Sequence, residues 1–168
     1  RHLDLFSGIG GFALAARMVG GYETVGFCEI EPYCQAVLRK HWPGVPIYDD
    51  VRSFRGVECD ILTGGFPCQP FSTAARGRNN AADLWPEMRR VIVECHPGWV
   101  VAENVGGLSL AGVDRVCGDL ENAGYAVWTF DLDTSLPTRQ RERRRYMFVA
   151  YADRDVEPRR TLNEEASC

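Results

Sequence analysis

The sequence has almost no lysine, no closely spaced pair of cysteines and no long apolar run. Its apolar stretches fall short of the roughly 18 residues that cross a bilayer, and the charged start, RHLDLF, is not a signal peptide. Seven cysteines without a CxxC spacing favour neither a disulfide framework nor a zinc site. We therefore expect a soluble intracellular protein with reduced thiols, no metal and no membrane association.

Basic residues are unevenly placed along the chain. The formal net charge is −4, which argues against a surface that is basic throughout. Only Lys40 is a lysine among the 19 basic residues, and eight arginines fall between Arg139 and Arg160. The arginine guanidinium can form paired hydrogen bonds with phosphates and guanine edges. This segment is therefore either an anion-binding surface or a solvated charged stretch.

The order of apolar and amphipathic stretches predicts an α/β protein of one domain. A length of 168 residues and an apolar fraction of 45% are enough for a single core. Strand-like runs lie at 2–6, 23–30, 60–65, 99–105, 125–133 and 146–152. Helix-like stretches lie at 12–19, 32–42, 84–96 and 113–124. This alternation predicts a mainly parallel sheet with helices on both faces, in a domain at 1–152 followed by a tail or linker at 153–168.

Most of the cysteines have no evident chemical task. In MRRVIVECH the apolar residues recur at spacings of three and four, which points Cys95 into the core. Free cysteine is among the most often buried residue types. The same interpretation is given to Cys28, Cys34, Cys59 and Cys117.

A glycine-rich turn follows the first strand, where open α/β sheets bind their ligands. In DLFSGIGGF, Gly8, Gly10 and Gly11 let the backbone turn tightly and approach a ligand before a helix begins near Phe12. The spacing differs from the GxGxxG of dinucleotide binders, so a tight turn without a ligand is the alternative.

Carboxylates end the next two strands. Glu29 follows the second strand, where a carboxylate can accept both hydroxyls of a ribose, and this placement predicts an adenosine-containing cofactor. Asp49 and Asp50 follow the next candidate strand and could accept from an adenine amino group. Each is alternatively a turn aspartate or a helix cap.

Two prolines bracket Cys68 in GGFPCQPFS. Pro67 and Pro70 fix two backbone torsions and remove two amide donors, so the segment is a rigid loop. Cys68 is then either a packed thiol or a nucleophile, which needs a lowered pKa or a nearby base. Glu103 ends the apolar strand WVVAENV, where a carboxylate is either ion-paired or placed to hold a heterocycle beside Cys68.

With these residues in place, the sequence resembles the cytosine-5 DNA methyltransferases of bacteria and phages. DLFSGIGGF, GGFPCQPFS, AENV and QRERRR follow the order of four motifs of that family, from about Leu3 to Ala152. The resemblance implies a class I S-adenosylmethionine-dependent methyltransferase fold, Rossmann-like, with a mainly parallel seven-stranded sheet. It also implies methyl transfer from S-adenosylmethionine to carbon 5 of a flipped cytosine, with S-adenosylhomocysteine as product.

The resemblance assigns most of the candidate residues to the cofactor pocket. Glu29 is implied to bind the ribose hydroxyls, and Ile30 to pack on the adenine where the family often has an aromatic residue. Asp50 and Val51 are implied to contact the other edge of the adenine. The full implied set is Phe6, Ser7, Gly8, Ile9, Gly10, Gly11, Glu29, Ile30, Asp50, Val51, Pro67 and Leu84.

The catalytic residues are implied in the same way. Cys68 adds to carbon 6 of the cytosine, and Glu103 holds ring nitrogen 3 and stabilises the charge that develops on the ring. Gln69 and Ser72 are implied to contact DNA.

The arginine motif fits the family pattern in two registers. Alignment on the strand YMFVA selects Arg141, Arg143 and Arg145, which share one face of a strand, with Arg141 in the glutamine position and in contact with DNA. Alignment on Gln140 instead puts an acid, Glu142, where the family has arginine. We prefer the first register, in which Arg143 and Arg145 serve catalysis.

The family continues past the arginine motif into a target-recognition region and a last segment that completes the cofactor pocket. Neither is found in DRDVEPRRTLNEEASC. We expect a trimmed chain, one subunit of a split enzyme whose second chain reads the sequence of double-stranded DNA, or a non-catalytic cofactor-binding relative. A tRNA cytosine-5 methyltransferase is the nearest alternative activity. The expected location is the cytoplasm of a bacterial or phage-infected cell, in restriction-modification or a related role.

Overall fold

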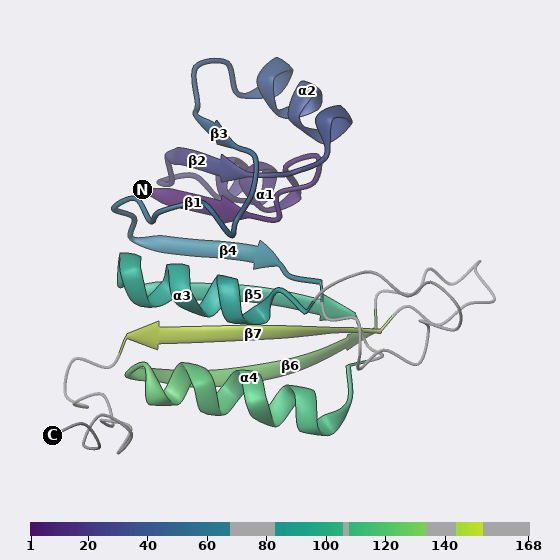
Figure 1. Ribbon diagram of the computed structural model, residues 1–168, viewed down its shortest axis with the longest axis vertical. Coiled ribbons are helices and arrows are strands. Elements are labelled where there is room, and N and C mark those ends of the chain that lie inside the picture. Colours follow the sequence, from purple (N-terminus) through teal and green to yellow (C-terminus); the bar gives the residue numbers. More distant parts are fainter. Residues whose placement is uncertain (68–82, 106–107, 134–143, 153–168) are drawn as a thin grey trace, which may run out of the picture.

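The computed structural model describes residues 1–67, 83–105, 108–133 and 144–152. These ranges form one sheet of seven strands in the order β3-β2-β1-β4-β5-β7-β6 (Figure 1). The elements are β1 (His2–Leu5), α1 (Gly11–Val19), β2 (Thr24–Cys28), α2 (Pro32–His41), β3 (Ile47–Tyr48), β4 (Ile61–Gly65), α3 (Trp85–Cys95), β5 (Trp99–Val105), α4 (Leu110–Asn122), β6 (Tyr125–Asp133) and β7 (Arg144–Ala152).

The strand order places a topological switch point at the centre of the sheet. Strands β1 to β5 are parallel, and β7 runs antiparallel to both β5 and β6. The chain proceeds from β1 towards one edge at β3, then returns to β4 and proceeds towards the other edge. In open α/β sheets, ligands bind beyond the carboxyl ends of the strands at such a reversal. The ends of β1 and β4 therefore mark the expected site.

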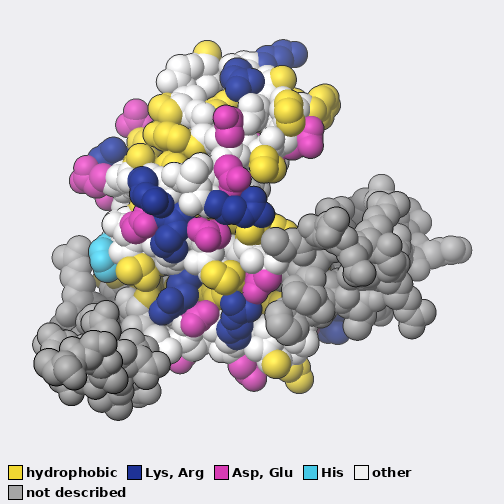
Figure 2. Space-filling model, viewed as in Figure 1, with side chains coloured by type: hydrophobic (Ala, Val, Ile, Leu, Met, Phe, Trp, Pro, Cys, Tyr) yellow, Lys and Arg dark blue, Asp and Glu magenta, His cyan; other side chains and the backbone are white. Residues whose placement is uncertain are grey.

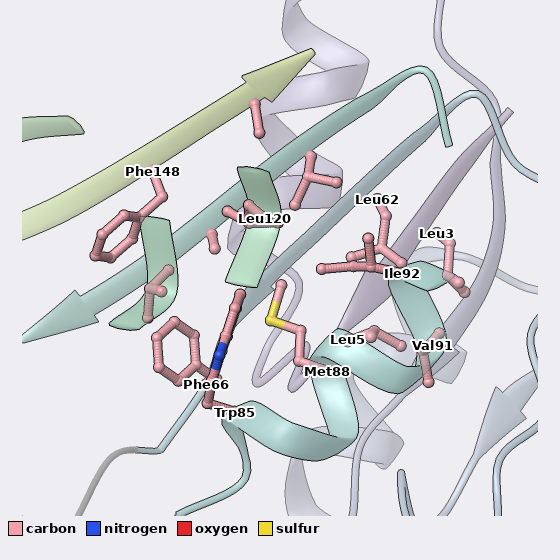
Figure 3. Packing of buried hydrophobic residues seen from close by; sticks show 14 of the residues in the cluster. Leu3, Leu5, Leu62, Phe66, Trp85, Met88, Val91, Ile92, Leu120 and Phe148 are labelled. Carbon is pink, nitrogen blue, oxygen red and sulfur yellow. The ribbon is translucent and has the colours of Figure 1, made fainter. Parts of the chain in front are cut away.

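The larger core lies between the sheet and helices α3 and α4, which cover the same face (Figure 1). Leu3 and Leu5 point to this face from β1, and Leu62 joins them from β4, as strand alternation requires (Figure 3). Trp85 and Met88 pack against them from α3, and all five side chains are at most 1% exposed. This burial supplies most of the hydrophobic stabilisation of the domain.

Helices α1 and α2 cover the opposite face, but only over one half of the sheet. Ala13, Phe27 and Leu38 form a smaller buried cluster there, with Trp42 packed against it. The Trp42 ring lies edge-on to Phe27 at 5.4 Å and under the Arg17 guanidinium at 5.2 Å. This cluster secures β1 and β2, the strands whose ends carry the glycine turn and Glu29.

The other half of that opposite face, over β5, β7 and β6, is covered by none of the described elements. We call it the open face. Its side chains are alternate residues on the three paired strands, and the Trp99 and Tyr151 rings lie 4.7 Å apart on it. Six apolar members are between 38% and 51% exposed: Trp99, Val105, Trp128, Phe130, Leu132 and Tyr151.

The face that carries α3 and α4 has an interspersed charge pattern. Figure 2 shows basic and acidic side chains side by side across it. Arg90 pairs with Glu87 and Glu94, at 2.9 and 2.7 Å, and Arg115 pairs with Asp83 at 2.6 Å. Among its described side chains, this face has no extended basic patch of the kind that holds a phosphate backbone.

The predicted fold class is confirmed, and most element bounds agree to within one or two residues. Strands β5 and β6 match the predicted ranges, whereas α4 begins three residues earlier than predicted. None of the helices in the described residues has the length and hydropathy that a membrane span requires. The proposed division at residue 152 stays a prediction, since 153–168 lies outside the described residues.

The core interpretation of the cysteines holds for most of them. Cys28 and Cys59 are buried, and Cys95 and Cys117 are partly buried against the larger core. The prediction for Cys34 is wrong, because this residue is only partly buried on α2 and belongs to neither core cluster.

Candidate functional site

The turn after β1 depends on backbone conformations that few residues adopt. Gly8 and Gly10 have φ of 53° and 88°, and the non-glycine Phe6 has φ of 52°. A Cβ at Gly10 would lie 2.7 Å from the Trp42 ring, so this position excludes any side chain. A Cβ at Gly8 would meet nothing within 4 Å, which leaves open space beside the backbone.

Ser7 holds the turn in place. Its hydroxyl donates to the Asp4 carbonyl oxygen at 2.6 Å, and its amide donates to the Cys28 carbonyl oxygen at 3.2 Å. The side chain is 7% exposed. The hydroxyl proton is therefore committed to the turn, and the contribution of Ser7 to a ligand site is to fix the backbone around it.

Glu29 lies beside the turn with its carboxylate fixed by backbone amides. Oε2 accepts from the Gly8 amide at 2.6 Å, and Oε1 accepts from the Glu31 amide at 2.8 Å. Each carboxylate oxygen has a further lone pair. The orientation of the carboxylate is thus set before any ligand arrives, and it can still accept two hydroxyl protons, as a ribose requires.

Two apolar side chains near Glu29 are left open to solvent. Ile9 in the turn is 61% exposed and Ile30, directly after Glu29, is 64% exposed. Exposed isoleucines beside a fixed carboxylate and a glycine turn offer an apolar surface for a flat ring. The predicted residues Phe6 to Gly11, Glu29 and Ile30 are therefore brought together by the fold.

Asp50 and Val51 are placed less directly for ligand contact. The Asp50 carboxylate accepts from the Arg52 amide at 2.9 Å and pairs with the Arg52 guanidinium at 3.2 Å, so it serves as a turn aspartate. Val51 is 4% exposed and packs in the larger core. Its carbonyl oxygen is also taken, by Arg90 at 2.7 Å. Contact with an adenine edge at this position therefore falls to exposed parts of Asp50 rather than to the Val51 side chain.

Pro67 and Leu84, which precede and follow Cys68 in the sequence, are brought together by a hydrogen bond. The Leu84 amide donates to the Pro67 carbonyl oxygen at 3.1 Å. This bond joins the chain at the end of β4 to the start of α3. The predicted residues Cys68, Gln69 and Ser72 lie outside the described residues.

Glu103 and Arg145 form an ion pair on the open face, one strand beyond β4. Arg145 Nε lies 2.6 Å from Glu103 Oε1, and both side chains are about a quarter exposed, at 26% and 27%. Gly65 is the β4 neighbour of Glu103, and a Cβ there would lie 3.1 Å from Glu103 Oε2. Gly65 thus leaves room for the carboxylate beside the strand that leads to Cys68.

The two arginines at the start of β7 point to opposite faces. Arg145 meets Glu103, whereas Arg144 pairs with Asp131 on β6 at 3.0 Å. The preferred register of the arginine motif includes Arg145 and excludes Arg144, and the choice of register stays a prediction. Arg141 and Arg143 fall outside the described residues.

Sequence reasoning assigned no task to Asn104, which connects the two candidate catalytic segments. It is 2% exposed, and its Nδ2 donates to the Phe66 carbonyl oxygen at 3.0 Å. Its Oδ1 accepts from the Val105 amide at 2.8 Å. Asn104 therefore fixes the backbone two residues before Cys68. The sequence signal for this role is an asparagine directly after the strand-end Glu103 of an apolar strand, because a polar group that is buried there needs hydrogen-bond partners.

A family model described as C-5 cytosine-specific DNA methylase matches residues 1–166. The chain belongs to this family. The Bacillus subtilis (strain 168) type II methyltransferase M2.BsuMI is 37% identical over 112 residues, which are 61% of this chain and 28% of that protein. The Herpetosiphon aurantiacus type II methyltransferase M.HgiBI is 34% identical over 142 residues, 76% of this chain and 32% of its own length. The chain thus spans about a third of the length of the curated relatives it matches.

Solved structures show the same fold. A putative DNA modification methyltransferase encoded within an Escherichia coli prophage superposes with a TM-score of 0.70 at 23% identity, over 90% of this chain and 46% of its own. Spodoptera frugiperda DNMT2 superposes with a TM-score of 0.72 at 20% identity, over 97% of this chain and 53% of its own. These likenesses confirm the class I methyltransferase fold that the motifs imply.

Proposed function

We propose that this chain carries the cofactor pocket and catalytic groups of a DNA cytosine-5 methyltransferase. The observation that carries the proposal is the convergence at the switch point of a glycine turn, an amide-fixed Glu29, the start of the cysteine loop and the Glu103–Arg145 pair. Family membership and the type II methyltransferases among its relatives favour DNA as the substrate. The proposed domain is 1–152, and the proposed place of action is the cytoplasm of a bacterial or phage-infected cell.

The residues present fit S-adenosylmethionine. Open space beside Gly8 admits a ligand close to the backbone, Glu29 can accept the ribose hydroxyls, and the exposed Ile9 and Ile30 suit an adenine ring. When bound, this cofactor supplies an electrophilic methyl group on a sulfonium. The chain holds it near the end of β4, where the cysteine loop begins.

In the proposed reaction, the thiolate of Cys68 forms a bond to carbon 6 of a flipped cytosine, and the ring electrons move to carbon 5. Carbon 5 would then be electron-rich enough to take the methyl group that bound S-adenosylmethionine would supply. A base then removes the carbon 5 proton, and the thiolate leaves. Glu103 holds ring nitrogen 3 through this sequence, and Arg145 fixes the Glu103 carboxylate by the 2.6 Å pair.

Sequence readout is proposed to come from a further segment or a second chain. The relatives extend well beyond the third of their length that this chain spans. The face with α3 and α4 carries interspersed charges and offers little phosphate contact. We therefore expect weak DNA binding by this chain alone.

A trapping experiment tests the proposed function. The chain is incubated with labelled S-adenosylmethionine and duplex DNA that carries 5-fluorocytosine, alone and with any neighbouring gene product. A labelled covalent adduct that Cys68→Ser abolishes is the expected result. Cofactor binding without adduct on DNA or RNA, even with a partner, would identify a non-catalytic binding subunit. An adduct on RNA alone would move the activity to the tRNA class.

A further inference from the structure

Three polar side chains lie buried behind the glycine turn, in a region where neighbouring strands otherwise supply apolar packing. His2 and Asp4 on β1 are 0% exposed, and Thr63 on β4 is 5% exposed. Thr63 Oγ1 donates to Asp4 Oδ1 at 2.8 Å, and His2 Nε2 lies 2.8 Å from the same hydroxyl. Buried polar groups of this kind are costly unless they are fully bonded, so their arrangement calls for an explanation.

The hydrogen bonds run in one direction, towards Asp4. A threonine hydroxyl has one proton, and Thr63 gives it to Asp4, so Thr63 must accept from His2 Nε2–H. His2 Nδ1 then has no proton and accepts from the Thr24 hydroxyl at 3.1 Å. Burial, with a smaller effect of the N-terminal ammonium, lowers the pKa of His2 to about 4, which agrees with a neutral ring.

Asp4 meets both ends of the glycine turn. Its carbonyl oxygen accepts from Ser7 Oγ at 2.6 Å where the turn begins. Its carboxyl lies near the Ala13 amide in the first turn of α1, where the N-cap residue Gly10 makes no side-chain cap. Asp4 Oδ2 has no hydrogen-bond partner among the described residues, so the Thr63 bond to Oδ1 is what holds the carboxyl against this turn of the helix. Gly8, whose amide donates to the Glu29 carboxylate, lies in the chain between Ser7 and Ala13.

We propose that Asp4, held by Thr63, is a positioning residue that fixes the glycine turn and Glu29 for cofactor binding. This inference rests on the proposed function. Asp4 does not touch the ligand, and it acts through the backbone of the turn. Loss of the Thr63 hydroxyl frees the carboxyl to rotate and lets the start of α1 shift against β1.

The charge state of Asp4 provides a distinct signature. Burial, opposed by the Thr63 and Ala13 hydrogen bonds and assisted by the Glu29 charge, raises the pKa of Asp4 to about 8. Of the other titratable groups around it, the buried His2 is neutral, because burial lowers its pKa to about 4. Asp4 is therefore protonated at neutral pH, and its ionisation above pH 8 places a second negative charge near Glu29.

The sign of the pH effect follows from the raised pKa. Above the ordinary pKa of 3.8 the unfolded chain has released the proton that the folded chain still holds, so stability falls as pH rises towards about 8. His2 has the opposite slope between about 4 and 6.5, where its depressed pKa makes stability rise with pH. Between pH values of about 6.5 and 8, Asp4 is the one of these two groups that still changes the stability with pH. The unfolding equilibrium constant is then expected to rise by up to about tenfold per pH unit.

Four variants test the positioning role, with the dissociation constant of S-adenosylhomocysteine as the readout. Thr63→Val removes one hydrogen bond to a buried group, so binding should weaken about tenfold at pH 7. Thr63→Ser restores the hydroxyl and should restore the affinity. Asp4→Asn mimics the protonated carboxyl: its affinity should equal that of the wild type at pH 7 and should not weaken at pH 9, where the wild type does. Thr129→Val, on the distant β6, is the matched control.

The outcomes separate this inference from the proposed function. If the wild type binds S-adenosylhomocysteine but Thr63→Val binds equally well, or the wild-type affinity is the same at pH 7 and pH 9, the positioning role is wrong and the proposed function stands. If the wild type binds no S-adenosylhomocysteine at any pH, both fail. Chemical unfolding of every variant at pH 7 shows whether lost affinity merely reflects lost folding.

Discussion

The two ends of the candidate site are built in different ways. At the proposed cofactor end, two backbone amides, from Gly8 in the turn after β1 and from Glu31 after β2, hold the Glu29 carboxylate, and positive φ angles shape the turn. At the catalytic end, the Glu103 carboxylate is held by a side chain, Arg145, which comes from a strand more than forty positions later in the chain. Main-chain donors orient the carboxylate at one end, and a side-chain partner from another strand orients it at the other.

This difference predicts different kinds of sensitivity. A carboxylate fixed by two amides stays oriented as long as the turn stays folded. A carboxylate oriented by a partly exposed ion pair with a side chain of another strand depends on the placement of β7 against β5. Substitutions at the cofactor end should therefore change affinity, and those at the catalytic end should change the rate. The following experiments test this separation, from the largest expected effect to the smallest.

Glu103→Gln should slow methyl transfer by about 100-fold or more, because an amide cannot give a proton to ring nitrogen 3 as thiolate addition makes the ring electron-rich. Single-turnover transfer of labelled methyl to DNA measures the rate, in whatever assembly is active. The dissociation constant of S-adenosylhomocysteine should stay within about twofold. An equal loss of cofactor affinity would make the role of Glu103 structural and remove the contrast between the two ends.

Glu29→Gln should weaken S-adenosylhomocysteine binding by about 10- to 30-fold, since one of the two amide donors loses its acceptor. Isothermal titration measures the affinity. At saturating cofactor the methyl-transfer rate should change by less than about threefold, because Glu29 stabilises the bound cofactor equally in the ground state and in the transition state. A large fall in that rate would show that the two ends are coupled.

Arg145→Gln should slow methyl transfer by about tenfold, because Glu103 loses an ion-pair partner that helps to orient it. The neighbouring Arg144→Gln is a matched control, since it removes the same charge from the same strand but on the opposite face. Its exposed pair with Asp131 is worth about 0.2–1 kcal/mol of stability, and the rate should change by less than about twofold. Equal effects of the two variants would point to general charge attraction for DNA instead of orientation.

Much of the fold follows from periodicity because burial is the dominant signal. The apolar run of β5 and the alternation of β6 fix both strands at their predicted bounds. Helix α4 was predicted to begin at 113, yet Ser109 caps it, with Oγ accepting from the Gly112 amide at 3.1 Å. A serine cap followed by Leu-Ala-Gly is a weak signal in sequence, because glycine has a low helix propensity.

The candidate site was less fully predictable. Glu29 and Glu103 were found because carboxylates at strand ends stand out among apolar residues. Asn104 was given no role because its partner is a carbonyl oxygen, at Phe66, which no sequence pattern reveals. The Val51 side chain packs in the larger core because the chain after β3 is held against α3, where Arg90 donates to the Val51 and Phe54 carbonyl oxygens. Contacts of this kind depend on tertiary packing.

The open face gives this protein a built-in optical probe. Of its tryptophans, Trp99 and Trp128 lie on that face at 45% and 51% exposure, whereas Trp85 in the core is 1% exposed. Indole emission shifts to shorter wavelength and resists quenching when water is removed from around the ring. A partner that covers the open face should therefore shift the tryptophan emission to shorter wavelength. An iodide titration should then show how far the partner protects the two rings from quenching.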